Sequence, residues 1–289
     1  MAASQRLNAS VEALAALGAK LRLRSENMEG DPRVRRLLQE VVRSIDPKLL
    51  DGLNPEQEAT ALGFIQAFFR QAVDLLENPA RAPGWVYADP LVLQAQGKAS
   101  FLVVRAIEAL AAQKPDLGET LKRPGAFLDV GTGVGWLAIE AARSWPAMKV
   151  VGIDPWEPAL KIARANVAES GVADRIELRS QGVQQLQDCE AYSLVWLAGP
   201  FLPPEVVDVA LERSRNALAP GGWLVFGLYT QPPDPLGQAL TTLRVVRSGG
   251  HPWTANEIES RLGALEFEQI EVSALRPPVL MVVGKRPEK

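Results

Sequence analysis

The most informative stretch of the chain is FLDVGTGVGW, residues 127–136. An apolar run, which predicts a buried strand, leads into a loop with glycine at alternate positions, and a helical pattern follows directly. Glycines allow a ligand to lie directly against the backbone. In an open α/β sheet, ligands bind beyond the carboxyl ends of the strands, near the switch in strand order. The stretch therefore predicts a ligand-binding loop between a strand and a helix.

An acidic residue follows this loop at a suggestive distance. The apolar run at 150–153 ends at Asp154, 19 residues after Gly135. A carboxylate at the end of the second strand can accept hydrogen bonds from both hydroxyls of a ribose. The loop and the carboxylate together predict a site for a nucleoside-containing ligand.

The spacing of the glycines narrows the choice of nucleoside. A dinucleotide fingerprint, G-x-G-x-x-G, would place its third glycine at Trp136, where an indole prevents the close approach of strand and helix. The phosphate-binding P-loop is absent, because the chain contains no Gly-Lys-Ser/Thr triplet. Neither a dinucleotide nor a nucleoside triphosphate is therefore the expected ligand.

The pattern D-x-G-x-G-x-G at 129–135 resembles motif I of the class I S-adenosylmethionine-dependent methyltransferases. Asp154 then matches the acidic residue that holds the ribose in that family. The resemblance continues through LAPGGWL at 218–224, similar to the family's Pro-Gly-Gly turn before the fifth strand, and through a terminal hairpin. It covers about residues 121–289, and it implies S-adenosylmethionine as cofactor and S-adenosylhomocysteine as product.

The resemblance also implies roles for individual residues. The family commonly has an acidic residue that accepts a hydrogen bond from the adenine amino group, and Gly182 stands in its place here. The backbone amide of Val183 can still donate a hydrogen bond to the adenine ring, and Gln181 or Gln184 can replace the missing acceptor. A segment that closes over the cofactor in some small-molecule methyltransferases resembles the region from Tyr87 onward. The implied cofactor-binding set is Asp129, Gly131, Gly133, Gly135, Asp154, Pro155, Gln181, Gly182, Val183, Tyr87, Gln96 and Ser100.

The chain changes character near residue 120, which predicts two domains. Residues 1–120 show helical spacing, with one helix at 55–77 and another at 90–113, and form an expected helical cap or lid. Residues 121–289 alternate strands and helices and form the expected cofactor-binding domain. Its predicted strands are 126–130, 149–153, 176–179, 193–197, 223–228, 267–272 and 279–283. The fold class is α/β, a Rossmann-like doubly wound sheet of seven strands whose last two form an antiparallel hairpin with a proline-containing turn.

Candidate acceptor-side residues follow the fourth and fifth strands. Trp196, Pro200 and Phe201 come at the end of the strand at 193–197, where this family often places substrate contacts. His251, in a loop before the last helix, is the candidate catalytic base, because imidazole exchanges protons near neutral pH. Each could instead have an ordinary packing or surface role.

Composition excludes several classes of protein. The chain has 289 residues, a formal charge of -3, one cysteine and one histidine. It therefore lacks an overall positive field for nucleic acid or an anionic membrane, and it cannot form an internal disulfide or a nitrogen- and sulfur-rich metal cluster. No targeting or membrane-spanning segment is recognisable, so we expect a cytoplasmic location.

Three functions compete at this point. The leading hypothesis is a methyltransferase that acts on a small-molecule acceptor, such as a secondary metabolite, with a homodimer surface on the N-terminal helices. A second is a protein or RNA methyltransferase, and the acidic composition weighs against RNA. A third is a protein that binds the nucleoside without chemistry, or a dinucleotide oxidoreductase, against which Trp136 argues. The atom that would accept the methyl group cannot be read from the sequence.

Overall fold

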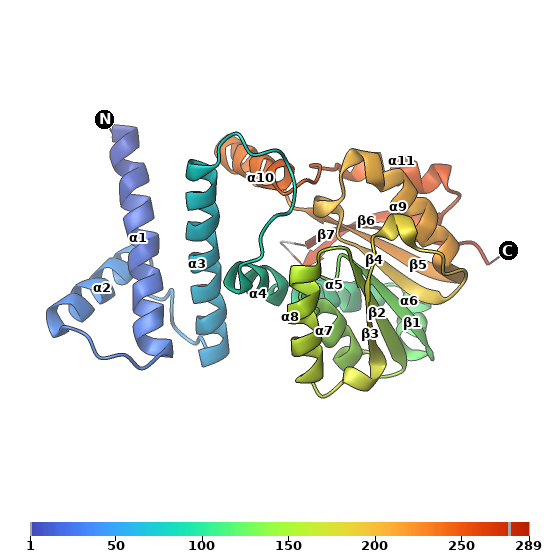
Figure 1. Ribbon diagram of the computed structural model, residues 1–289, viewed down its shortest axis with the longest axis horizontal. Helices are drawn as coiled ribbons and strands as arrows, with labels where there is room; N and C mark the ends of the chain where they lie inside the picture. Colours follow the sequence, from blue (N-terminus) through green and yellow to red (C-terminus); the bar gives the residue numbers. More distant parts are fainter. Residues whose placement is uncertain (1, 277–278, 289) are drawn as a thin grey trace. The chain divides into compact units, whose positions relative to one another are not determined.

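The computed structural model describes residues 2–276 and 279–288 (Figure 1). The chain divides into two compact units, Met1–Ala80 with Asp89–Gln96, and Arg81–Ala88 with Gly97–Lys289. It therefore crosses between the units three times. The change of sequence pattern, in contrast, suggested a single boundary near residue 120.

The first unit is helical, as its sequence predicts. Its elements are α1 (Ala2–Ser25), α2 (Pro32–Ile45), α3 (Pro55–Glu77) and most of α4 (Pro90–Lys98). Asn54 caps α3, because its side-chain oxygen accepts a hydrogen bond from the Gln57 amide at 2.9 Å and its own amide donates to Gln57 Oε1 at 2.9 Å. This capping box explains why the predicted range of α3 is confirmed. A small buried core consists of Leu21, Leu62 and Ile65.

The second unit is built on one seven-stranded sheet, in the order β3-β2-β1-β4-β5-β7-β6. The strands are β1 (Gly125–Val130), β2 (Met148–Asp154), β3 (Ile176–Ser180), β4 (Tyr192–Leu197), β5 (Leu218–Tyr229), β6 (Glu268–Arg276) and β7 (Val279–Lys285). The first five pair in parallel, whereas β7 pairs antiparallel with both β5 and β6. The predicted fold class is thus confirmed. The proline-containing turn at 277–278 lies outside the described residues.

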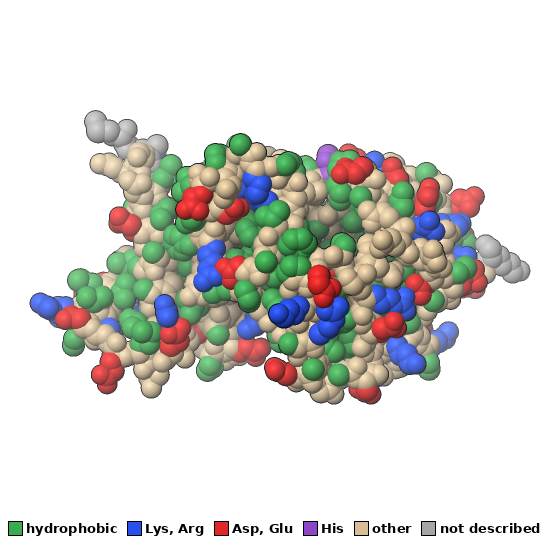
Figure 2. All heavy atoms as spheres, viewed as in Figure 1, with side chains coloured by type: hydrophobic (Ala, Val, Ile, Leu, Met, Phe, Trp, Pro, Cys, Tyr) green, Lys and Arg blue, Asp and Glu red, His purple; other side chains and the backbone are tan. Residues whose placement is uncertain are grey.

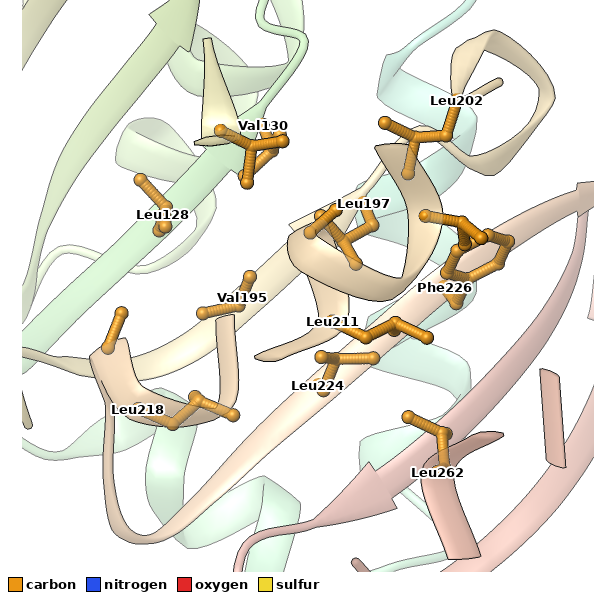
Figure 3. Close-up of a cluster of buried hydrophobic side chains, with 14 of the residues drawn as sticks. Leu128, Val130, Val195, Leu197, Leu202, Leu211, Leu218, Leu224, Phe226 and Leu262 are labelled. Atoms are coloured by element: carbon orange, nitrogen blue, oxygen red, sulfur yellow. The ribbon is translucent and has the colours of Figure 1, made fainter. Parts of the chain in front are cut away.

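Helices cover both faces of this sheet. The covering helices are α5 (Phe101–Ala111), α6 (Pro115–Lys122), α7 (Trp136–Ser144), α8 (Glu157–Ala168), α9 (Pro204–Ala217) and α11 (Ala255–Ala264). Helix α10 (Pro235–Arg247) contributes no residue to the two buried clusters at the sheet, among the residues that the structure describes. Consecutive strand residues point to opposite faces. Phe127 accordingly packs in a cluster with residues of α5, α6 and α7, and Leu128 packs in another with residues of α9 and α11 (Figure 3).

Several features of the helices differ from the prediction. The helix predicted at 90–113 is two helices, because the chain turns tightly after α4, where the Ser100 amide donates to the carbonyl of Gly97 at 2.9 Å. The helix predicted from Val134 begins at Trp136, because Gly135 has a left-handed φ of 82°. Helices α6 and α10 were not predicted.

The described part of the chain contains no helix that is both long and apolar enough to cross a membrane. On the face drawn in Figure 2, acidic and basic side chains are interspersed rather than separated into fields of one sign.

Candidate active site

The glycine loop lies between the carboxyl end of β1 and the start of α7. Gly131, Gly133 and Gly135 have φ values of 79°, 55° and 82°, in the left-handed region that favours glycine. The amides of Gly131 and Thr132 both donate to the carbonyl of Ile153, at 2.9 and 3.1 Å. The loop is therefore held against the end of β2, and its unusual backbone explains the alternate glycines.

Asp154 lies at the end of β2 and is 9% exposed. Its Oδ2 accepts a hydrogen bond from the Gly133 amide at 2.9 Å, and its Oδ1 accepts one from the Trp156 amide at 2.8 Å. Burial raises the pKa of this carboxyl above its ordinary value, and the two hydrogen bonds oppose the rise. The sequence-predicted partners, glycine loop and carboxylate, are thus in direct contact.

Asp129 is the most buried carboxyl near the loop, at 1% exposed. The Thr132 hydroxyl donates to its Oδ2 at 2.7 Å, whereas its buried Oδ1 has no hydrogen-bond partner among the described residues. Burial raises the pKa of Asp129 to about 7, with a further increase from the nearby charge of Asp154. A buried carboxyl oxygen without a partner is costly, so this position suits a ligand group that donates hydrogen bonds or carries positive charge.

The residues implied to contact adenine follow β3 at the same edge of the sheet. Ser180, the last residue of β3, pairs in register with Asp154. Gln181 and Gly182 come next, and Val183 begins the short 3-10 helix η2 (Val183–Gln185). The Gly182 amide donates to Gln185 Oε1 at 3.1 Å, so this amide already has an intrachain partner.

Residues 81–88, which we call the strap, belong to the second unit and contact this edge of its sheet. The indole N–H of Trp156 donates to the carbonyl of Tyr87 at 2.8 Å. The cofactor residues that the resemblance implies fall in both units, because Tyr87 and Ser100 belong to the second unit and Gln96 belongs to the first. Pro155 lies between Asp154 and Trp156 and is exposed.

Trp196 lies inside β4 rather than beyond it. Its side chain is 7% exposed and belongs to the buried cluster that contains Phe127. It packs over Gly227, where a Cβ atom would lie 2.2 Å from the Trp196 ring. The structure therefore places Trp196 in the core, and the surface beyond β4 is formed by Pro200 and Phe201 of the 3-10 helix η3 (Gly199–Phe201).

His251 lies against this same surface. A Cβ atom at the neighbouring Gly250 would lie 1.8 Å from the Pro200 carbonyl oxygen, so only glycine permits this approach. The His251 ring lies 4.3 Å from the Trp253 ring, centroid to centroid. A shallow hollow that encloses about 10 Å³ opens here, lined by Pro200, Leu228, Tyr229, Gln231, Val245, His251, Pro252 and Trp253.

Residues of this site that were not singled out from the sequence include Thr132, Trp156, Tyr229 and Gln231. Tyr229 ends β5, so a search of strand ends beyond the fourth strand could have found it. Trp156 contacts a carbonyl 69 residues away in the chain, and no local pattern reveals such a pair. No group of three or more metal-ligating side chains occurs within the described ranges.

Comparison with known proteins agrees with this geometry. A family model described as a methyltransferase domain matches residues 127–222. The demethylmenaquinone methyltransferase of Thermus thermophilus is 31% identical over 157 residues, which cover 54% of this chain and 70% of that protein. The chain belongs to the class I S-adenosylmethionine-dependent methyltransferases. S-adenosylmethionine is accordingly its cofactor.

Other relatives of this methyltransferase match a smaller part of their length. The ribosomal protein L11 methyltransferase of a Geobacter species is 32% identical over 128 residues, 44% of this chain and 40% of that protein. The chain thus aligns with less than half the length of that curated relative.

The solved structure of human N-acetylserotonin methyltransferase with S-adenosylmethionine has a TM-score of 0.68 at 15% identity and covers 99% of this chain and 98% of that one. The likeness in fold includes both units.

Proposed function

We propose that this methyltransferase transfers the methyl group to a small-molecule acceptor, an activity of the EC 2.1.1 type. The observation that carries the proposal is the pocket around His251 and its position. A Cβ atom at Gly131 would lie 3.5 Å from the Cβ of Ala198, and Pro200, two residues further along, lines the pocket. Two residues span at most about 7 Å, so a short segment connects the lining of the pocket to the residue that faces Gly131.

The size and lining of the pocket favour one functional group of a small acceptor. The space that it encloses is about 10 Å³, about that of one water molecule and far below the range of about 300–1,000 Å³ that is typical of sites for whole ligands. Its polar side chains, Tyr229, Gln231 and His251, stand among apolar ones. The name of the human structural neighbour, which refers to a small acceptor, supports the same proposal.

The cofactor would be held by the glycine loop and the two buried aspartates. The backbone at Gly131 and Gly133 leaves room for a ligand, whereas a Cβ atom at Gly135 would lie 3.3 Å from the Cβ of Ala163, so Gly135 serves close packing against α8. Asp154 would accept hydrogen bonds from the ribose hydroxyls. The unpartnered Oδ1 of Asp129 suits the methionine ammonium. Adenine contacts would come from the segment 181–183, and the strap would add Tyr87.

His251 would act as the base for an acceptor that carries a hydroxyl. S-adenosylmethionine supplies a methyl group bound to a sulfonium. The acceptor attacks the methyl carbon in line with the C–S bond, and the sulfur is the leaving group. As the new O–C bond forms and the C–S bond breaks, the imidazole would take the hydroxyl proton, and S-adenosylhomocysteine is the thioether left behind. An amine acceptor presented unprotonated would need no such base.

Transfer of isotopic label tests the class of acceptor. The enzyme is incubated with methyl-labelled S-adenosylmethionine and a cell extract, which is then separated into small molecules, protein and RNA. We expect label in the small-molecule fraction, at a rate that Asp154→Ala lowers in parallel with a loss of a few kcal/mol in cofactor binding by calorimetry. Label confined to protein or RNA would overturn the proposal, and absence of enzyme-dependent transfer to all three would favour a non-catalytic binding protein.

The N-terminal helices carry a candidate dimer surface, and we propose that the enzyme is a homodimer through it. Helix α2 exposes a stripe of apolar side chains at helical spacing, which we call the α2 stripe. It consists of Val34, Leu37, Val41 and Ile45, which are 38–55% exposed. Contiguous exposed apolar side chains of this kind mark interaction surfaces.

A further inference from the structure

The strap has no helix or strand of its own and is held at several points. Near its start, the Gly84 amide donates to the carbonyl of Arg247 at 3.1 Å, at the end of α10. The Trp85 ring meets the Phe201 ring edge to face, with 5.5 Å between centroids. Near its end, the carbonyl of Tyr87 accepts the hydrogen bond from Trp156. All these contacts lie within the second unit.

These attachment points lie on both sides of the glycine loop. Trp156 follows β2, and Phe201 follows β4. In the sheet, β1 lies between β2 and β4, and parallel strands end at the same edge. The strap therefore passes across the carboxyl end of β1, where the glycine loop is.

Trp156 joins the strap to the cofactor carboxylate through two separate N–H groups. Its backbone amide donates to Asp154 Oδ1 at 2.8 Å, and its indole donates to the Tyr87 carbonyl at 2.8 Å. Displacement of the strap would pull on the same residue that orients Asp154. We infer that Trp156 is a positioning residue that couples closure of the strap to retention of the cofactor. This inference rests on the proposed role of Asp154 in holding the ribose.

The test compares the release of S-adenosylhomocysteine from the full-length enzyme and three variants. Trp156→Phe keeps an aromatic ring and removes the indole N–H. Trp85→Leu loosens the strap at Phe201, away from Asp154. Trp145→Phe is the control, because the Trp145 indole nitrogen has no hydrogen-bond partner among the described residues.

We expect Trp156→Phe and Trp85→Leu each to raise the dissociation rate of S-adenosylhomocysteine about fivefold to tenfold, as for loss of one net hydrogen bond or a comparable contact. Trp145→Phe should leave this rate unchanged. Trypsin cleavage after Arg81 gives a second readout. S-adenosylhomocysteine should protect this bond in the wild type and protect it less in the two strap-loosening variants.

The possible outcomes separate the inference from the function on which it rests. If Trp156→Phe speeds dissociation while Trp85→Leu does not and cleavage after Arg81 is unchanged, Trp156 acts on Asp154 alone and the coupling is wrong. Unchanged dissociation in both variants also overturns it. If Asp154→Ala binds S-adenosylhomocysteine as tightly as the wild type, the ribose role fails, whatever the strap variants show.

Discussion

Asp129 illustrates how a single residue can link cofactor binding to pH. Its buried carboxyl has a pKa of about 7 without ligand, so it is largely protonated at pH 6. A cationic ammonium beside it favours the carboxylate. Binding of S-adenosylmethionine at pH 6 must therefore release a proton, and affinity should fall as pH decreases below 7, approaching about tenfold per pH unit.

Calorimetry at pH 6 in two buffers with different protonation enthalpies measures this release. We expect the release to be close to one proton at pH 6 and absent in Asp129→Asn at the same pH. Proton-independent binding by the wild type at pH 6 would show that Asp129 does not face the ammonium.

At the residue scale, the sequence predicts the local part of the site. The glycine loop and Asp154 were predicted because cofactor binding requires glycines at alternate positions and an acidic residue at the end of the next strand, a pattern that lies within a short stretch of sequence. The bond between Trp156 and Tyr87 was not, because it joins distant segments. Trp196 was a candidate substrate contact because the family often places such contacts after the fourth strand, with a packing role as the alternative. The packing of its ring over Gly227 of the neighbouring strand shows the packing role.

At the scale of elements, one contact within the second unit requires a residue without a side chain, Gly97. A Cβ atom at Gly97 would lie 2.2 Å from Val134 Cγ2, an atom on a stiff side chain. Gly97→Ala should therefore destabilise the protein by about 1–3 kcal/mol, because the loop or the helix end must shift. It should also weaken binding of S-adenosylhomocysteine.

Gly63→Ala is the matched control, because it is also a helical glycine but has only Ala95 at 3.9 Å. It should raise stability by up to about 1 kcal/mol through helix propensity. Chemical unfolding measures both. Equal effects of the two substitutions would show that the contact with Val134 is relaxed at no cost.

The elements differ in how far their sequence reveals them. Helix α3 has a capping residue, a first-turn proline and an Asn-Pro stop, and its predicted range matches. The break between α4 and α5 was missed, because apolar spacing continues through the turn that the Ser100 amide and the Gly97 carbonyl close. Helix α10 contains a glycine and two adjacent threonines, which weaken the helical pattern.

At the scale of the whole molecule, the α2 stripe predicts the oligomeric state. Light scattering during gel filtration should give twice the chain mass for the wild type. Leu37→Glu, in the centre of the stripe, should shift the enzyme toward the monomer, because a buried unpaired charge opposes association. Arg36→Gln, on the other side of α2, should leave the mass unchanged. A wild-type monomer at high concentration would refute the dimer.

The global order of helices and strands was readable from the sequence, whereas the division into units was not. The pattern changes where strands begin, but helices α5 and α6 pack with Phe127 and Trp223 in the core of the second unit. Helical periodicity identifies an apolar face without showing which sheet or helix it covers.

The three crossings between units bear on how this enzyme could be recombined with its relatives. A chimera joined at residue 120 would separate α5 and α6 from the sheet that they cover. An exchange of the helical unit alone would need junctions after Ala80, Ala88 and Gln96, with the strap kept beside its own sheet. Exchange of this helical unit between two related enzymes would therefore require recombination at three junctions together, so we expect the helical unit and the sheet to be inherited as a pair.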